Sequence, residues 1–156
     1  MSDAARPEAP GPAPDGRPVP DDVTALGGLA VAGDVTVRVG GQDLVVMVDR
    51  LLSAERVGPE EVAALLPRVR SVLAEFAAVR ERAAAFLWEW GAEGGETEEE
   101  RAGFHRDMAP TTLTVTAAAQ FALHFESRSG SYFPDGYWPA VHLDGDLRPD
   151  RVTVEA

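Results

Sequence analysis

Residues 59–91 read PEEVAALLPRVRSVLAEFAAVRERAAAFLWEWG, and this stretch decides the fold. Its apolar residues recur at the spacing of one face of an amphipathic helix. A proline followed by two glutamates suits the positive end of that helix. The apolar face keeps its phase across Pro67, so we expect one long helix that is kinked at this proline. The face consists of Val62, Leu66, Val69, Leu73, Phe76, Ala83, Leu87 and Trp90, widened by Val72, Val79 and Phe86.

The residues before this helix predict a β-hairpin. Residues 35–39 alternate valine with polar side chains, which is the two-residue period of a half-buried strand. A second apolar run covers residues 44–48. Gly40-Gly41 lies between the two runs and suits a tight turn, because both positions accept a positive φ. Residues 29–32 are expected to add a short strand.

A short second helix is predicted after the long one. Thr97 and Glu100 have the spacing of a capping box, in which each side chain accepts a hydrogen bond from the other residue's backbone amide. We expect this helix to end near Asp107 or Met108 and to be stopped by Pro110.

The remaining residues predict a sheet. Apolar residues alternate with polar ones at 113–115 and 121–126, a further strand is expected at 137–143, and a last one at 152–154. Asp144-Gly145 suits a turn between the last two. Strands, then helices, then strands indicate an α+β fold: a mostly antiparallel sheet packed on one long kinked helix plus a short helix.

The first 22 residues differ from the rest of the chain. They hold six of the twelve prolines and almost no large apolar side chain. Proline removes backbone donors and disfavours helix in the residue before it. We therefore expect residues 1–22 to be a disordered proline-rich tail and residues 23–156 to be a single α+β domain.

Charge limits the classes of partner. The formal net charge is −12. Nucleic acids and anionic membranes bind proteins largely through lysine and arginine, so we expect neither as a partner. An acidic surface favours another protein as the partner, in particular a basic one.

Four residue types, Cys, Lys, Ile and Asn, are missing from the chain. Without cysteine there are no disulfides, thiol nucleophiles or metal–thiolate sites. The rarity of residues with AT-rich codons points to a GC-rich bacterial genome. No apolar run is long enough to span a membrane and the first residues lack the apolar core of a signal peptide, so we expect a cytoplasmic protein.

The histidines offer one hypothesis of catalysis. His124-x-Glu126 and His142-x-Asp144 each place two polar side chains on one face of a predicted strand. If the two strands pair, these four residues could hold zinc or manganese in a small metal-dependent hydrolase. The alternative is an ordinary solvent-facing sheet surface. We assign no catalytic residue and expect no cofactor.

Two groups of residues are candidates for binding a partner. The first is the acidic run of Glu96, Glu98, Glu99 and Glu100, within a segment (89–100) that contains six glutamates and no basic residue. The second consists of the aromatic residues around Pro134-Asp135-Gly136, because aromatic side chains on a loop can mark a binding surface. Its members are Tyr132, Phe133, Tyr137 and Trp138. The alternatives are a solvated linker and aromatic side chains that close the end of the core.

Three stretches carry a resemblance to known proteins: FLWEWGAEGGETEEERAGF (86–104), TLTVTAAAQFALHFE (112–126) and YFPDGYWPAVHLDGDL (132–147). They are similar to a group of small bacterial domains of unknown function, some of which are predicted from gene neighbourhood to be immunity proteins of toxin systems. The resemblance covers residues 26–156 and transfers no functional residue. It implies a non-enzymatic, toxin-neutralising interaction domain; the alternatives are the metal-dependent hydrolase and a structural or regulatory module.

Overall fold

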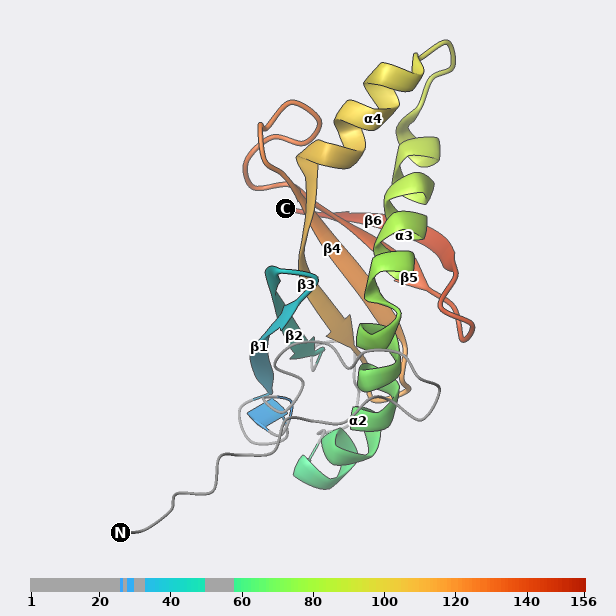
Figure 1. Ribbon diagram of the computed structural model, residues 1–156. Coiled ribbons are helices and arrows are strands. Elements are labelled where there is room, and N and C mark those ends of the chain that lie inside the picture. Colours follow the sequence, from blue (N-terminus) through green and yellow to red (C-terminus); the bar gives the residue numbers. More distant parts are fainter. Residues whose placement is uncertain (1–25, 27, 30–32, 50–57) are drawn as a thin grey trace, which may run out of the picture.

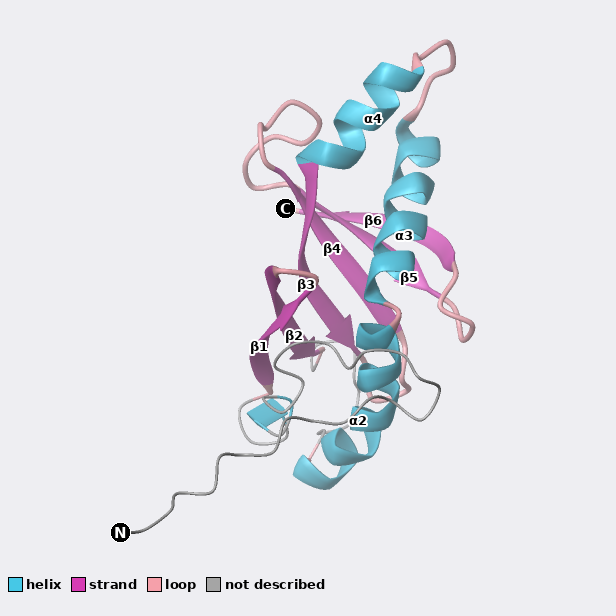
Figure 2. Cartoon of the chain, in the orientation of Figure 1, coloured by secondary structure: helices cyan, strands magenta, loops and turns pink. Residues whose placement is uncertain are grey.

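A computed structural model describes residues 26, 28–29, 33–49 and 58–156, and Figures 1 and 2 show their arrangement. Six strands form one sheet, and three helices lie between the second and third strands of the sequence. The elements are β1 (Asp34–Val39), β2 (Gln42–Val48), α2 (Pro59–Ala74), α3 (Phe76–Gly91), α4 (Glu98–Asp107), β3 (Met108–Val115), β4 (Phe121–Ser127), β5 (Trp138–Leu143) and β6 (Pro149–Glu155). The predicted tail (1–22) lies outside the described residues, as does most of the strand expected at 29–32.

The strands follow one another across the sheet in sequence order, from β1 to β6. Four of the five neighbouring pairs are antiparallel, which confirms the predicted α+β class with a mostly antiparallel sheet. The exception is the parallel pair β2–β3, where Val45 lies opposite Thr112. Parallel neighbours need a long crossover connection, and here it contains all three helices. The sequence did not predict this pair.

The predicted hairpin is confirmed at β1 and β2. Gly40 and Gly41 have φ of +58° and +77°, so both lie in the left-handed region that favours glycine. Such a turn matches the right-handed twist of the strands that it joins.

The long helix is interrupted, but at Glu75 and not at Pro67 as predicted. Pro67 lies inside α2, and Glu75 separates α2 from α3 with φ −106° and ψ 17°. The position of Pro67 explains why the helix continues there. Its side chain and the preceding residues Ala63 and Ala64 are exposed, so water can bond the carbonyl that the proline leaves free.

One face of the sheet packs against α2 and α3, as Figure 1 shows. Phe121, Leu123 and Phe125 of β4 are all buried in this core, together with the predicted helix residues Leu73 and Leu87. Trp90 was expected on the buried face and is not, since 53% of it is exposed. It is the last residue but one of α3, where the helix extends past the sheet.

The short helix α4 has the predicted capping box, with both hydrogen bonds present between Thr97 and Glu100. It ends at Asp107 as expected, but Pro110 does not follow it in a loop. The chain passes directly into β3, where Pro110 pairs with Phe125 next to a register shift. An irregularity of this kind accommodates a residue that lacks the amide donor.

Within the described ranges, no helix has both the length and the apolar character needed to cross a membrane.

Candidate functional site

An aromatic pocket lies where the last turn of α3, helix α4 and the β4–β5 loop meet. These elements extend together beyond one end of the sheet, in the upper part of Figure 1. The pocket has a volume of about 470 Å³. Its walls are mainly aromatic and its only charged residues are acidic: the lining consists of Leu87, Trp88, Trp90, Gly91, Ala92, Glu96, Glu100, Phe104, Tyr132 and Phe133.

Phe104 connects the aromatic walls. It is buried, and its ring lies 5.3 Å from that of Trp88 and 5.0 Å from that of Tyr132, in tilted and edge-on orientations. Both are favourable arrangements of aromatic pairs. Trp90 and Tyr132 remain 53% and 41% exposed, so the pocket presents indole and phenol surface to solvent.

The two pocket glutamates are held in place by backbone amides. Glu96 accepts hydrogen bonds from the amides of Glu93 (2.7 Å) and Gly94 (3.0 Å). Glu100 accepts one from the amide of Thr97 through Oε2, at 2.9 Å. Amide hydrogen bonds, first from its own backbone and then from that of Glu93, lower the pKa of Glu96, so its carboxylate is charged at neutral pH. Backbone hydrogen bonds therefore hold the carboxylates of two glutamates at the pocket.

Asp107, the last residue of α4, holds the β4–β5 loop against the pocket. Its carboxylate accepts hydrogen bonds from the buried Ser127 hydroxyl and from the amide of Ser129 at 2.9 Å. Its carbonyl accepts a third from the amide of Arg128 at 3.0 Å. The Ser127 hydroxyl in turn accepts from the amide of Tyr132. This network fixes the loop that carries Tyr132.

We expect Asp107→Ala to lower the free energy of unfolding by about 1–2 kcal/mol at pH 7, because it leaves a buried hydroxyl without its partner. Burial acts to raise the pKa of Asp107, but the hydrogen bonds from Ser127 and Ser129 outweigh it, so the pKa is lowered. The stabilisation is then complete above the ordinary pKa of aspartate, about 3.9, and is lost as pH falls below it.

Urea denaturation of both proteins between neutral and strongly acidic pH would measure this difference. Asp135→Ala, in the same loop but exposed, is the control and should change little. If the loss in free energy of unfolding caused by Asp107→Ala stayed constant down to the lowest pH, the role given to the Asp107 carboxylate would be contradicted.

The structure brings four of the predicted partner-binding residues together. Glu96, Glu100, Tyr132 and Phe133 line the aromatic pocket, although the sequence placed them in two separate groups. Glu98 and Glu99 are exposed on the first turn of α4, beside the pocket. Trp138, the first residue of β5, and Tyr137 just before it are exposed and do not line the pocket.

Trp88, Trp90 and Phe104 line the pocket but were not predicted as binding residues. The signal available was the crowding of aromatic residues at 86–90, directly before the acidic segment. Helical periodicity assigned Trp90 to the core instead.

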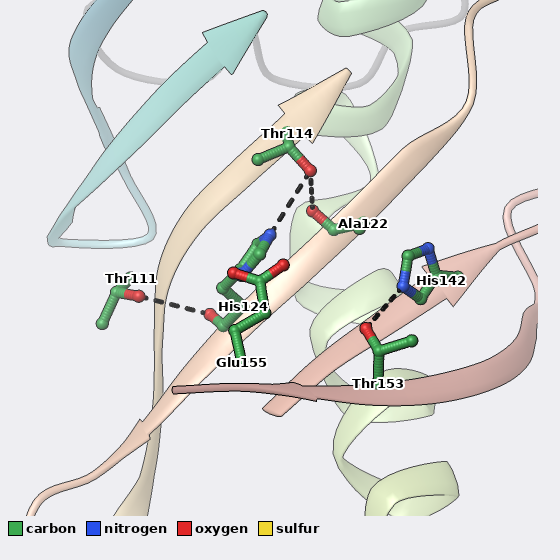
Figure 3. A network of polar contacts seen from close by, with 7 residues as sticks. All are labelled: Thr111, Thr114, Ala122, His124, His142, Thr153 and Glu155. Carbon is green, nitrogen blue, oxygen red and sulfur yellow. Dashed lines mark hydrogen bonds and ion pairs between the residues drawn. The ribbon is translucent and has the colours of Figure 1, made fainter. Parts of the chain in front are cut away.

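The face of the sheet opposite α2 and α3 holds His124 and His142, shown in Figure 3. Nδ1 of His124 lies 3.7 Å from the Glu155 carboxylate, and its Nε2 lies 3.4 Å from the Thr114 hydroxyl. On the neighbouring strand, Nε2 of His142 lies 2.8 Å from the Thr153 hydroxyl. A hollow of about 720 Å³ runs along this histidine face.

Both imidazoles are neutral at pH 7. Burial lowers the pKa of His124 despite the opposing charges of Glu155 and Asp49. Burial and then the charge of Arg151 lower the pKa of His142. Each ring can therefore both donate and accept one hydrogen bond.

Of the predicted metal candidates, His124, His142 and Asp144 line the hollow and Glu126 does not. Among the described residues, no three histidine, aspartate or glutamate side chains are grouped so that they could hold a metal ion. The register of β4 and β5 is the reason: His124 lies opposite Ala140, two residues along β5 from His142, and Glu126 lies further along β4, away from Ala122, the partner of His142.

Comparisons of this chain with protein-family models, curated proteins and solved structures gave no match.

Proposed function

We propose that this chain is a non-enzymatic protein-interaction domain that binds a basic protein through the aromatic pocket and the acidic residues around it. The observation that carries the proposal is the pocket itself, where exposed aromatic rings and fixed carboxylates occur together. Exposed aromatic side chains contribute a large share of the binding energy of many protein interfaces.

Electrostatics support a basic partner. The segment 89–100 contributes six glutamates and no basic residue, and the whole chain carries a net charge of −12. Charges of one sign raise the rate at which partners of the opposite sign are captured. The most specific form of the proposal is neutralisation of a toxin, in which this acidic face covers the basic surroundings of the toxin's active site.

The hydrolase has less support. A catalytic metal needs about three protein ligands, and the described part of the histidine face offers no such group. The hydrogen bonds of His124 and His142 to threonines also suit a polar sheet surface.

The proposal can be tested with the proteins encoded by the genes on either side of this one. Each would be expressed with the full chain in a bacterial host, with growth and complex formation as readouts. We expect the chain to form a stable complex with a basic neighbour and to restore growth where that neighbour is toxic.

Two variants separate the surfaces. Trp90→Ala with Tyr132→Ala should abolish binding and rescue, since both side chains are exposed and their loss leaves the core intact. His124→Ala with His142→Ala should leave both unchanged. Loss of rescue only in the histidine variant would contradict the proposal and favour the enzyme.

A further inference from the structure

Resting on the function proposed above, we propose that the aromatic pocket receives a single arginine side chain of the partner. The aromatic rings would contact the guanidinium plane, and the carboxylates of Glu96 and Glu100 would accept its hydrogen bonds. This inference names the group that is recognised, which the proposed function leaves open.

The rings provide the surface that a flat cation prefers. A cation is attracted to the face of an aromatic ring, most strongly to that of tryptophan. The pocket is lined by Trp88, Trp90, Phe104, Tyr132 and Phe133. The ring of Phe104 already contacts the rings of Trp88 and Tyr132. The half-exposed indole of Trp90 makes no comparable ring contact among the described residues, so its face is available to a ligand.

The carboxylates provide the matching charge. Of the glutamates in 89–100, only Glu96 and Glu100 line the pocket. A carboxylate has about four acceptor positions, and backbone amides occupy only part of this capacity in either residue. Their orientation is fixed before a ligand arrives, so binding costs little side-chain entropy.

These features favour arginine over lysine. A guanidinium is planar, stacks on aromatic rings and donates up to five hydrogen bonds in a fixed fork, whereas an ammonium is a compact and strongly hydrated charge. The pocket volume of about 470 Å³ lies in the range of sites that hold small ligands, about 300–1,000 Å³.

The test uses the three tryptophans of the chain, which give three indole N–H signals in a nitrogen–proton NMR spectrum. Trp88 and Trp90 line the pocket, and Trp138 on β5 is an internal control with 43% exposure. The full chain would be titrated with the blocked peptide Gly-Arg-Gly amide. Its counterparts would carry citrulline, which is neutral but has the same shape, or lysine.

We expect the arginine peptide to move the Trp88 and Trp90 signals in a saturable way and to leave Trp138 unchanged. The citrulline and lysine peptides should bind at least several-fold more weakly. Movement of all three signals together, equal effects of arginine and citrulline, or binding of lysine as tight as that of arginine would each overturn the inference.

Matched variants locate the binding. With Trp88 as the reporter, Trp90→Leu should weaken the arginine peptide about two- to fivefold, while Trp138→Leu should not. Glu96→Gln with Glu100→Gln should weaken it about tenfold, because charge-assisted hydrogen bonds are lost. Glutamine still forms a capping box, so α4 is preserved. Glu98→Gln with Glu99→Gln changes the net charge equally, in the first turn of α4 beside the pocket, and is the control.

The outcomes separate this inference from the function on which it rests. If a basic partner binds the full chain through the pocket but the arginine peptide moves neither the Trp88 nor the Trp90 signal, the arginine assignment fails and the interaction domain stands. If the peptide binds as described and no basic neighbour does, the pocket assignment stands and the toxin-neutralising function fails.

Discussion

Phe76→Ala is expected to lower the free energy of unfolding by about 3–5 kcal/mol, and Leu73→Ala by about 2–5 kcal/mol. Phe76 is 4% exposed and Leu73 1% exposed, on either side of the break at Glu75. Truncation removes buried apolar surface and leaves a cavity in the layer between the helices and the sheet. Both residues belong to the core that joins α2 and α3 to the sheet.

Chemical denaturation followed by circular dichroism would measure both losses. Arg80→Ala, on the same helix as Phe76, is the control and should cost little, because its side chain is only partly covered. Near-neutral values for both apolar substitutions would mean that the helices bury a different face.

Glu98→Arg with Glu99→Arg is expected to slow association with the basic partner about tenfold at low salt. The double variant changes the formal net charge from −12 to −8 beside the aromatic pocket. Complementary charge mainly raises the association rate, by a factor of about 10–10³ in strongly steered complexes. Glu100 is left intact, because its carboxylate caps α4 and its reversal would damage the helix as well as the surface charge.

Stopped-flow kinetics at increasing salt would test this effect. It should shrink towards physiological ionic strength, where exposed charges are screened over about 8 Å. Glu60→Arg with Glu61→Arg is the control of equal charge change: these two glutamates also lie in the first turn of a helix, α2, at the opposite end of the helical layer in Figure 1. Equal slowing by both variants would show that the net charge of the chain, and not the position of the glutamates, determines the association rate.

Local features of the fold were predictable from the sequence because a few neighbouring residues determine them. The Gly40-Gly41 turn and the Thr97 capping box are of this kind. The parallel β2–β3 pair is not, since it depends on where the long helical connection returns the chain to the sheet. The position of the helix break was not predictable either, because the helical pattern itself does not tell that Pro67 lies on the exposed side of α2 and that the break comes at Glu75.

The candidate site was predictable only in fragments. Composition revealed the glutamates of 89–100, and turn residues revealed the aromatic β4–β5 loop. Their association depends on Phe104 of α4, whose ring contacts Trp88 of α3 and Tyr132 of the β4–β5 loop. No pattern within the acidic segment or the loop contains that information, because these contacts join residues that lie far apart in the sequence.

The parallel pairing of β2 with β3 also has a consequence for the order in which the chain folds. Strands β3 to β6 follow one another through short connections, so their ends meet at little cost in chain entropy. Val45 and Thr112, by contrast, can meet only after the whole helical segment has been closed into a loop. We therefore expect the four C-terminal strands to assemble early and the β1–β2 hairpin to dock late. Until it docks, the backbone groups of β3 form an open edge, and the unfinished sheet is prone to pair with a second chain.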